Sequence, residues 1–221
     1  MLRNVSVAAV LALMSVGVVA CGGSEPPPPP PVVEEEAPAP DADSLAAARA
    51  AEREAAAMAL CDEARAAINS GDLSRARSLL QQINRDYAGT ECAGMASDLD
   101  GTINAITVLG ERVHFEFDRS RITDEAAAVL QRKAEVLRAH PNLRVTIEGH
   151  CDERGSLEYN MALGQRRAES ARRYLTGLGL SGDMFSTVSY GEERPIAQGS
   201  SESAWQQNRR GEFVIENLDA L

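Results

Sequence analysis

The fold is indicated most clearly by residues 143–168, which read LRVTIEGHCDERGSLEYNMALGQRRA. Leu143, Val145 and Ile147 alternate with polar residues, a pattern typical of a strand with one buried face. A polar run follows, and helix-forming residues then predict a helix over about 157–178. Polar residues between the end of a strand and the start of a helix lie where α/β domains commonly bind ligands.

The segments on either side of this stretch extend the same pattern. Val113, Phe115 and Phe117 alternate as in another half-buried strand. A helix capped by Thr123 or Asp124 is expected to run to about Ala139, because its apolar residues form one stripe. Further strands are expected over about 185–190 and 212–216. The order strand–helix–strand–helix–strand–strand predicts a compact α/β sandwich over residues 107–217.

Residues 44–106 form a small α-helical region in this interpretation. Strong helix formers predict helices over about 44–69, 73–86 and 92–106. The first contains Cys61, and Cys92 begins the third. A disulfide between these two cysteines could staple the helices, provided that the fold brings them within bonding distance.

The N-terminal residues have the features of an exported protein. Residues 1–20 combine a basic start, a short apolar run and small residues, as in a secretory signal peptide. Val18-Val19-Ala20-Cys21 resembles the lipobox of bacterial lipoproteins, which implies acylation of Cys21. Gly22 after that cysteine implies the outer membrane by the same resemblance. Residues 21–43, with six consecutive prolines, are expected to be a disordered linker.

The charge of the chain and its histidine-containing motif argue against nucleic-acid binding and against a zinc site. The formal net charge of −11 disfavours nucleic-acid binding, which requires basic side chains to neutralise phosphates. No cofactor is expected. His150 with Asp152 and Glu153 does not make a typical zinc set, so no metal is expected and His150 is interpreted as structural. Cys151 is expected to be a buried free thiol.

Several motifs of the C-terminal half resemble one family. They are Phe115-Glu116-Phe117-Asp118, the stretch 148–155 (EGHCDERG), Glu158-Tyr159-Asn160, Arg166-Arg167-Ala168, Ser189-Tyr190-Gly191-Glu192 and Asn208-Arg209-Arg210. In order and spacing they are similar to the OmpA-like domain, and most of all to that of the peptidoglycan-associated lipoproteins. The resemblance covers about half of the chain, and the helical region 44–106 lies outside it.

The resemblance implies noncovalent binding of diaminopimelate, in the stem peptide of peptidoglycan. The far end of diaminopimelate carries an ammonium and a carboxylate on one carbon. Asp152 matches the family's aspartate for the ammonium, and Arg167 matches its arginine for the carboxylate, which a guanidinium can bind with two hydrogen bonds. The remaining expected contacts are Phe117, Asp118, Asn160 and Leu163. Tol-system proteins are implied as further partners.

The leading hypothesis is therefore a tether between the outer membrane and the cell wall, without enzymatic activity. A second hypothesis is a protein-docking scaffold that acts through residues 44–106. A third, less favoured, is a peptidoglycan hydrolase in which Asp152, Glu153 and Glu158 supply acid and base. It is less favoured because no Cys–His or Ser–His–Asp set has a recognisable spacing.

Overall fold

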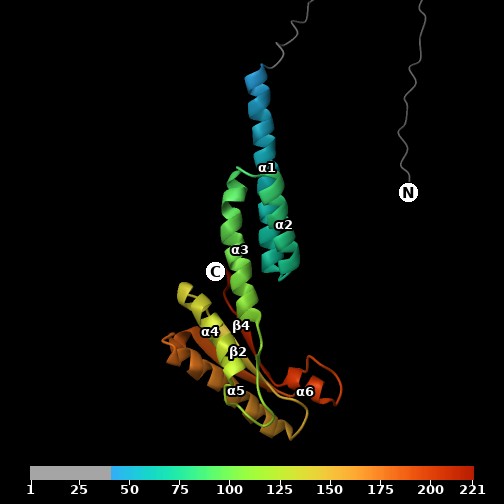
Figure 1. Ribbon diagram of the computed structural model, residues 1–221, viewed down its shortest axis with the longest axis vertical. Helices are drawn as coiled ribbons and strands as arrows, with labels where there is room; N and C mark the ends of the chain where they lie inside the picture. The colour runs from blue at the N-terminus through green and yellow to red at the C-terminus, as the bar shows by residue number, and fades with distance from the viewer. Residues whose placement is uncertain (1–40) are drawn as a thin grey trace, which may run out of the picture. The chain divides into compact units, whose positions relative to one another are not determined.

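The computed structural model describes residues 41–221 (Figure 1). The expected signal peptide, the lipidated Cys21 and nearly all of the proline-rich linker lie outside the described residues. Among residues 41–221, none of the helices is long and apolar enough to cross a membrane.

Three helices precede the sheet: α1 (Ala42–Asn69), α2 (Leu73–Asp86) and α3 (Glu91–Gly110). Asp41, Asp72 and Thr90 cap them by accepting hydrogen bonds from backbone N–H groups of the first turn. The helices bury one shared apolar cluster, which includes both half-cystines. Cys61 and Cys92 form a disulfide with Cα atoms 6.0 Å apart. In Figure 1 the first half of α1 continues past the ends of α2 and α3.

The α/β part contains the strands β1 (Val113–His114), β2 (Val145–His150), β3 (Phe185–Gly191) and β4 (Arg210–Ile215). They form one sheet in the order β1-β4-β2-β3, in which β2 is parallel to β3 and antiparallel to β4. Helices α4 (Asp124–Ala139), α5 (Leu157–Gly177) and α6 (Glu202–Asn208) complete it. The predicted α/β class is confirmed, and α6 was not predicted.

A single apolar core joins the sheet to α4 and α5. Its sheet side consists of alternate residues such as Val145, Ile147 and Phe213, and its helix side of stripes that include Leu130 and Leu175. The register places Ile147 opposite Phe213 on neighbouring strands, so both side chains point to the same face. The alternation seen in the sequence therefore corresponds to this buried face.

The first strand differs from the prediction. The alternation of apolar residues predicts a strand as far as Phe117, but β1 ends at His114. Asp118 has a positive φ of 53°, and the side chain of Phe117 is 53% exposed. A backbone that turns into the left-handed region cannot continue a strand. The chain turns away from the sheet here and carries Phe117 to the surface.

The helical region is attached to the sheet region through the end of α3. That helix continues to Gly110, so the expected boundary after residue 106 falls inside it. Leu109 belongs to the core of the α/β part. Lys133, the only lysine of the chain, is fully buried on α4 and donates to the carbonyls of Val108 and Leu109 at 2.9 and 2.5 Å. Its ammonium lies 4.4 Å from the centre of the Phe213 ring.

Two glycines allow α5 to lie directly on β2. A Cβ atom at Gly149 would overlap the carbonyl oxygen of Gly164, and one at Gly164 would overlap Ser189 Oγ. Only glycine permits this backbone approach. The contact seats the first half of α5 against the end of β2, where the predicted ligand-binding residues lie.

Candidate functional site

The polar loop 151–156 connects β2 to α5. Its start is tied to β3, because the Cys151 N–H donates to the Gly191 carbonyl at 2.7 Å. Its end is the cap of α5, where the Ser156 side chain accepts from the Tyr159 N–H. Ser156 therefore fills the capping position, so the side chain of Asp152 is available for another role.

A hollow of about 210 Å³ opens beside this loop. It is smaller than the ~300 to 1,000 Å³ of most drug-sized pockets, which suits the end group of a larger ligand. The residues that line it are Phe117, Asp118, Cys151, Asp152, Arg154, Gly155, Tyr159, Asn160, Leu163 and Arg167.

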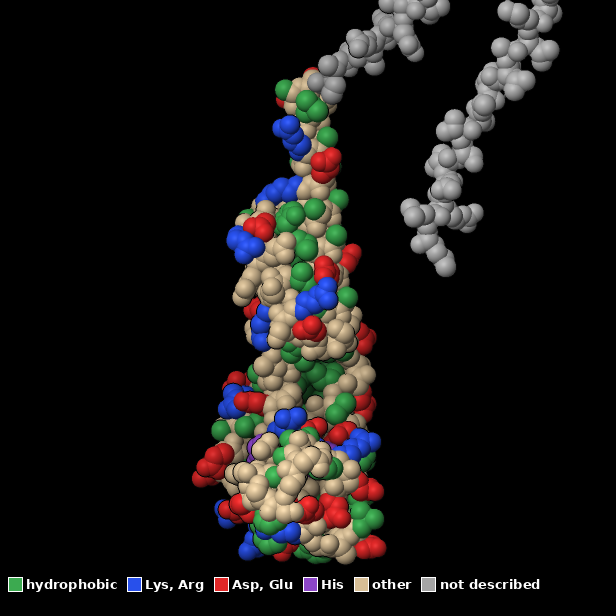
Figure 2. Space-filling model, turned by 90° about the vertical axis from the view of Figure 1, so that its right-hand side faces the viewer, with side chains coloured by type: hydrophobic (Ala, Val, Ile, Leu, Met, Phe, Trp, Pro, Cys, Tyr) green, Lys and Arg blue, Asp and Glu red, His purple; other side chains and the backbone are tan. Residues whose placement is uncertain are grey.

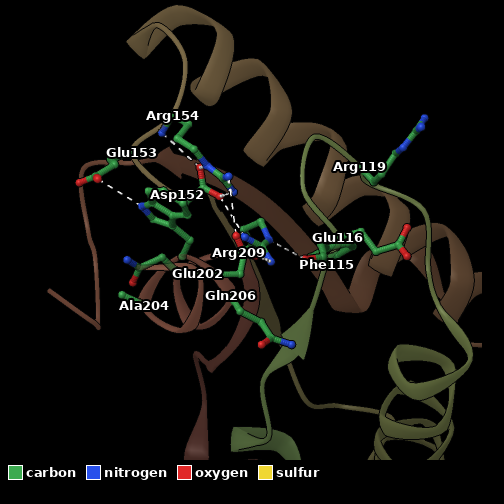
Figure 3. Close-up of polar contacts among 12 residues, drawn as sticks. Phe115, Glu116, Arg119, Asp152, Glu153, Arg154, Glu202, Ala204, Gln206 and Arg209 are labelled. Atoms are coloured by element: carbon green, nitrogen blue, oxygen red, sulfur yellow. Dashed lines mark hydrogen bonds and ion pairs between the residues drawn. The ribbon is translucent and has the colours of Figure 1, made fainter. Parts of the chain in front are cut away.

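Asp152 is the buried anion of the hollow and is already paired. It is 3% exposed and accepts hydrogen bonds from Arg154 Nη2 at 2.7 Å and Arg209 Nη1 at 3.2 Å (Figure 3). The Arg154 backbone N–H donates to it as well, at 3.1 Å. Burial alone would raise the pKa of Asp152, but the hydrogen bonds from Arg154 and Arg209 outweigh it and hold the pKa below its usual value.

Arg167 is the buried cation of the hollow, and it also holds the surrounding backbone together. Its guanidinium is 1% exposed and donates to the carbonyls of Glu116 at 3.0 Å, Arg119 at 2.9 Å and His150 at 2.7 Å. Burial lowers the pKa of this guanidinium from its usual value. Arginine has five N–H donors, so two on its terminal nitrogens remain beyond these three carbonyls. Those two suit a carboxylate.

Arg154 closes one side of the hollow between two aromatic rings. Its guanidinium carbon lies 3.9 Å from the centre of the Phe117 ring and 4.0 Å from that of Trp205. Both distances are within the range of a cation–π interaction. Glu153 fixes the other side of the indole by accepting from Trp205 Nε1 at 3.2 Å. Arg154 is thus held in front of Asp152 by stacking as well as by hydrogen bonds.

Helix α5 supplies the floor of the hollow. Asn160, Leu163 and Arg167 are all buried on it and line the same hollow. Asn160 Nδ2 donates to the carbonyls of Asp152 at 3.3 Å and Arg154 at 3.2 Å, so it holds the loop in place. Tyr159, also on α5, donates through its hydroxyl to the carboxylate of Asp118.

Comparison with known proteins identifies the family. The OmpA family model matches residues 114–209. The chain is 44% identical over 127 residues to the peptidoglycan-associated lipoprotein of Rhizobium meliloti (strain 1021), which covers 58% of this chain and 70% of that protein. With the protein of the same name from Haemophilus influenzae (strain ATCC 51907 / DSM 11121 / KW20 / Rd), identity is 48% over 130 residues, or 58% and 82% of the two chains. The chain belongs to the peptidoglycan-associated lipoprotein family.

A solved structure carries the same family name. The crystal structure of the peptidoglycan-associated lipoprotein from Burkholderia pseudomallei is 45% identical and matches with a TM-score of 0.46. It covers 48% of this chain and 89% of that one. The family resemblance stated from the motifs is confirmed by the identity with the proteins of Rhizobium meliloti and Haemophilus influenzae.

All six residues expected to bind the ligand of a peptidoglycan-associated lipoprotein line the one hollow. They are Phe117, Asp118, Asp152, Asn160, Leu163 and Arg167. Their roles as ligand contacts stay a prediction. The structure adds a feature that the sequence interpretation did not contain: both charges have protein partners before any ligand arrives.

Three residues of this network were not predicted: Arg154, Glu202 and Trp205. Arg209 belongs to the quoted motif Asn208-Arg209-Arg210. Arg209 Nη2 donates to Glu202 at 2.8 Å, and its Nε donates to the Phe115 carbonyl at 3.0 Å. Arg154 was within the quoted motif, and Trp205 is the only tryptophan of the chain. The motif could have identified Arg154, and the rarity of tryptophan could have identified Trp205.

Two other residues near the hollow, Cys151 and His150, do not change protonation state near neutral pH. Cys151 is a buried free thiol, as expected. Burial raises its pKa to about 11, so it stays protonated and unreactive at neutral pH. His150 is buried behind the loop, and burial lowers its pKa to about 4. Its ring is therefore neutral over the physiological range.

Proposed function

We propose that this protein tethers the outer membrane to the cell wall. An acylated Cys21 anchors it in the membrane, and residues 107–217 bind the diaminopimelate of the peptidoglycan stem peptide without cleaving it. Tol-system proteins are its partners in the periplasm. The observation that carries the proposal is that Asp152 and Arg167, fifteen residues apart in the chain, line one small hollow.

The ligand's zwitterionic end fits the two charges. Its ammonium binds Asp152, and its carboxylate accepts the N–H groups of Arg167 that the backbone carbonyls leave free. Arg154 now donates to the Asp152 oxygens that the ammonium needs. The ammonium therefore replaces the Arg154 guanidinium, which slides out along the Phe117 and Trp205 rings.

The surface agrees with this kind of ligand. Acidic and basic side chains are interspersed over the face shown in Figure 2, and the whole chain has a net charge of −11. A long anionic polymer such as nucleic acid would be repelled by that net charge. A small zwitterion is neutral and is recognised locally inside the hollow.

The test is sedimentation with purified sacculi. Asp152→Asn keeps the shape of the side chain and removes its charge, so we expect binding to weaken about 10- to 150-fold, since a charge-assisted bond contributes ~1.5 to 3 kcal/mol. Asp183→Asn removes an exposed carboxylate away from the hollow and should bind like the wild type. Equal pelleting of Asp152→Asn and the wild type would refute the assignment.

The ligand offers a second arm of the test. Sacculi with lysine in place of diaminopimelate keep the side-chain ammonium but lack the neighbouring carboxylate. They should pellet much less protein, and free diaminopimelate should compete where free lysine does not. This arm tests the role of Arg167 without changing it, because Arg167→Ala would also free three buried carbonyls.

Three further assays address other parts of the proposal. Incubation of the protein with sacculi should release no muropeptides, whereas a hydrolase would release them. Cys21→Ser should move the protein from the membrane fraction to the soluble periplasmic fraction, since the acyl chains supply the anchoring free energy. Outer-membrane fractionation of the unaltered protein tests its destination.

A further inference from the structure

A second polar cluster lies where β2 ends and β4 begins, on the sheet face opposite to the α4 and α5 core. Glu148 on β2 and Glu212 on β4 are directly opposed in the antiparallel register. His150 is two residues after Glu148 on the same strand and so points to the same face. One nitrogen of His150 and one oxygen of each glutamate all lie within 4.8 Å of one another.

The imidazole of His150 lacks a partner although it is buried. It is 1% exposed, and among the described residues neither Nδ1 nor Nε2 has a hydrogen-bond partner. A polar group left unpaired in the interior costs ~1 to 3 kcal/mol, so a partner for this ring is expected. Tyr190 stacks on the ring with centroids 5.6 Å apart and holds its orientation.

Each of the two glutamates has a carboxylate oxygen near this ring that can act as a metal ligand. Arg112 and Arg210 both donate to Oε1 of Glu212, at 2.8 and 2.7 Å, and within residues 41–221 no donor contacts its Oε2. Oε2 of Glu148 lies 3.5 Å from His150 Nε2. Like charges directly opposed across two strands destabilise a sheet. A cation between the two carboxylates would remove that repulsion and give the ring a partner.

We propose that Glu148, His150 and Glu212 bind a divalent metal ion of the zinc class. Zinc prefers imidazole nitrogen and carboxylate oxygen at ~2.0 to 2.2 Å, and two ligands of a tetrahedral ion at that distance are roughly 3.3 to 3.6 Å apart. The 3.5 Å between His150 and Glu148 already matches, and a small side-chain rotation of Glu212 would complete the set. Water fills the fourth position, which is reached past the partly exposed glutamates.

Three arginines around the site affect how strongly it binds a metal ion. Arg112 and Arg210 orient Glu212 in the manner of outer-shell groups at metal sites. Together with Arg194 they also place positive charge nearby, which repels a cation and lowers the affinity of the site. This ligand set differs from the one rejected from the sequence, in which His150 was grouped with Asp152 and Glu153. The structure pairs those two acids with Arg154 and Trp205 instead.

The experiment uses the full chain, stripped with chelator and titrated with Zn²⁺ against a chromophoric competitor. The wild type should bind one equivalent. Glu148→Gln and Glu212→Gln should each weaken that binding by at least about 10-fold, since changes to a metal's supporting shell alone cost that much. The matched control is Glu216→Gln, which removes a neighbouring carboxylate that bonds Ser186 at 3.0 Å and lies outside the cluster.

A second measurement follows the histidine itself. Zn²⁺ should shift the ¹⁵N resonances of the His150 ring in the wild type and in Glu216→Gln, and leave them in place in Glu148→Gln. Thermal unfolding without metal verifies that each variant is folded, which we expect because glutamine keeps the shape of glutamate. Absence of Zn²⁺ binding, or binding that neither Glu148→Gln nor Glu212→Gln weakens, would overturn the proposal.

Discussion

The buried ammonium of Lys133 should make the stability of this protein rise with pH. Burial lowers the pKa of Lys133 to about 7, from an ordinary 10.5. Below pH 7 the side chain is charged in the folded and the unfolded state, and the folded state carries the full cost of burying that charge. Above pH 7 the folded state loses the proton first. The unfolded state then binds more protons, and the free energy of unfolding increases with pH.

The size of the effect follows from the two pKa values. From about pH 7 to about pH 8.5, a group with these pKa values adds about 1.5 to 2 kcal/mol to the free energy of unfolding. Urea unfolding followed by circular dichroism at both pH values measures it directly. Lys133→Met fills the same space without a titrating group and should lack this increase.

The same variant separates Lys133 from other groups. The lowered pKa of His150, about 4, also makes stability rise with pH, but mostly below pH 7. The raised pKa of Cys151, about 11, makes stability fall, but mostly above pH 9. Both contributions are also present in Lys133→Met. They therefore cancel when the change in stability with pH is compared between this variant and the wild type. A wild-type stability that is flat or falls over this range, or an equal rise in Lys133→Met, would contradict the reasoning.

Three further changes have defined outcomes. Gly149→Ala should destabilise the fold by about 3 kcal/mol or more in thermal unfolding, since its methyl group would overlap a backbone carbonyl of α5. Replacing Cys61 and Cys92 by serine should cost the helical region about 3 to 4 kcal/mol in urea unfolding, from the loop entropy of 31 residues, and leave sacculus binding unchanged. Arg154→Ala should raise the pKa of Asp152, seen in the titration of its carboxyl ¹³C resonance, because a major donor is lost.

Two of these changes, Gly149→Ala and Arg154→Ala, have a matched control. Gly101→Ala on α3 meets open space and should be neutral or slightly stabilising. Arg166→Ala removes an exposed arginine and should leave the Asp152 titration in place. A fully stable Gly149→Ala, a loss of sacculus binding on removal of the disulfide, or an unmoved Asp152 pKa would each count against the corresponding account.

Most of the fold could be predicted because the buried apolar residues recur in the sequence with the period of a helix or of a strand. Helix α2 and helix α4 begin and end where capping residues and apolar stripes place them. Helix α6 was missed since it has only seven residues, of which Ala204 and Asn208 alone are buried, so no apolar period exists to detect. The first strand was read too long because alternation cannot reveal the positive φ of Asp118.

The candidate site could be predicted in part for a related reason. Asp152 lies in the strand–helix connection and Arg167 on the helix that follows it, so short-range geometry brings them to one hollow. Arg209 is 57 residues from Asp152, and its contact depends on the register of β4 against β2. Pairing of that kind follows from the assembled sheet and has no local sequence pattern. For the same reason, no sequence pattern predicts that Arg167 donates to three backbone carbonyls.

The stacking of Trp205 on Arg154 has a practical consequence. The indole is the only one in the chain, so the intrinsic fluorescence excited near 295 nm comes from this single position beside the hollow. Any ligand that moves the guanidinium away from the ring changes the polarity around the indole. The unlabelled protein thus carries its own optical probe for occupancy of the hollow, and soluble stem-peptide fragments can be ranked by emission alone.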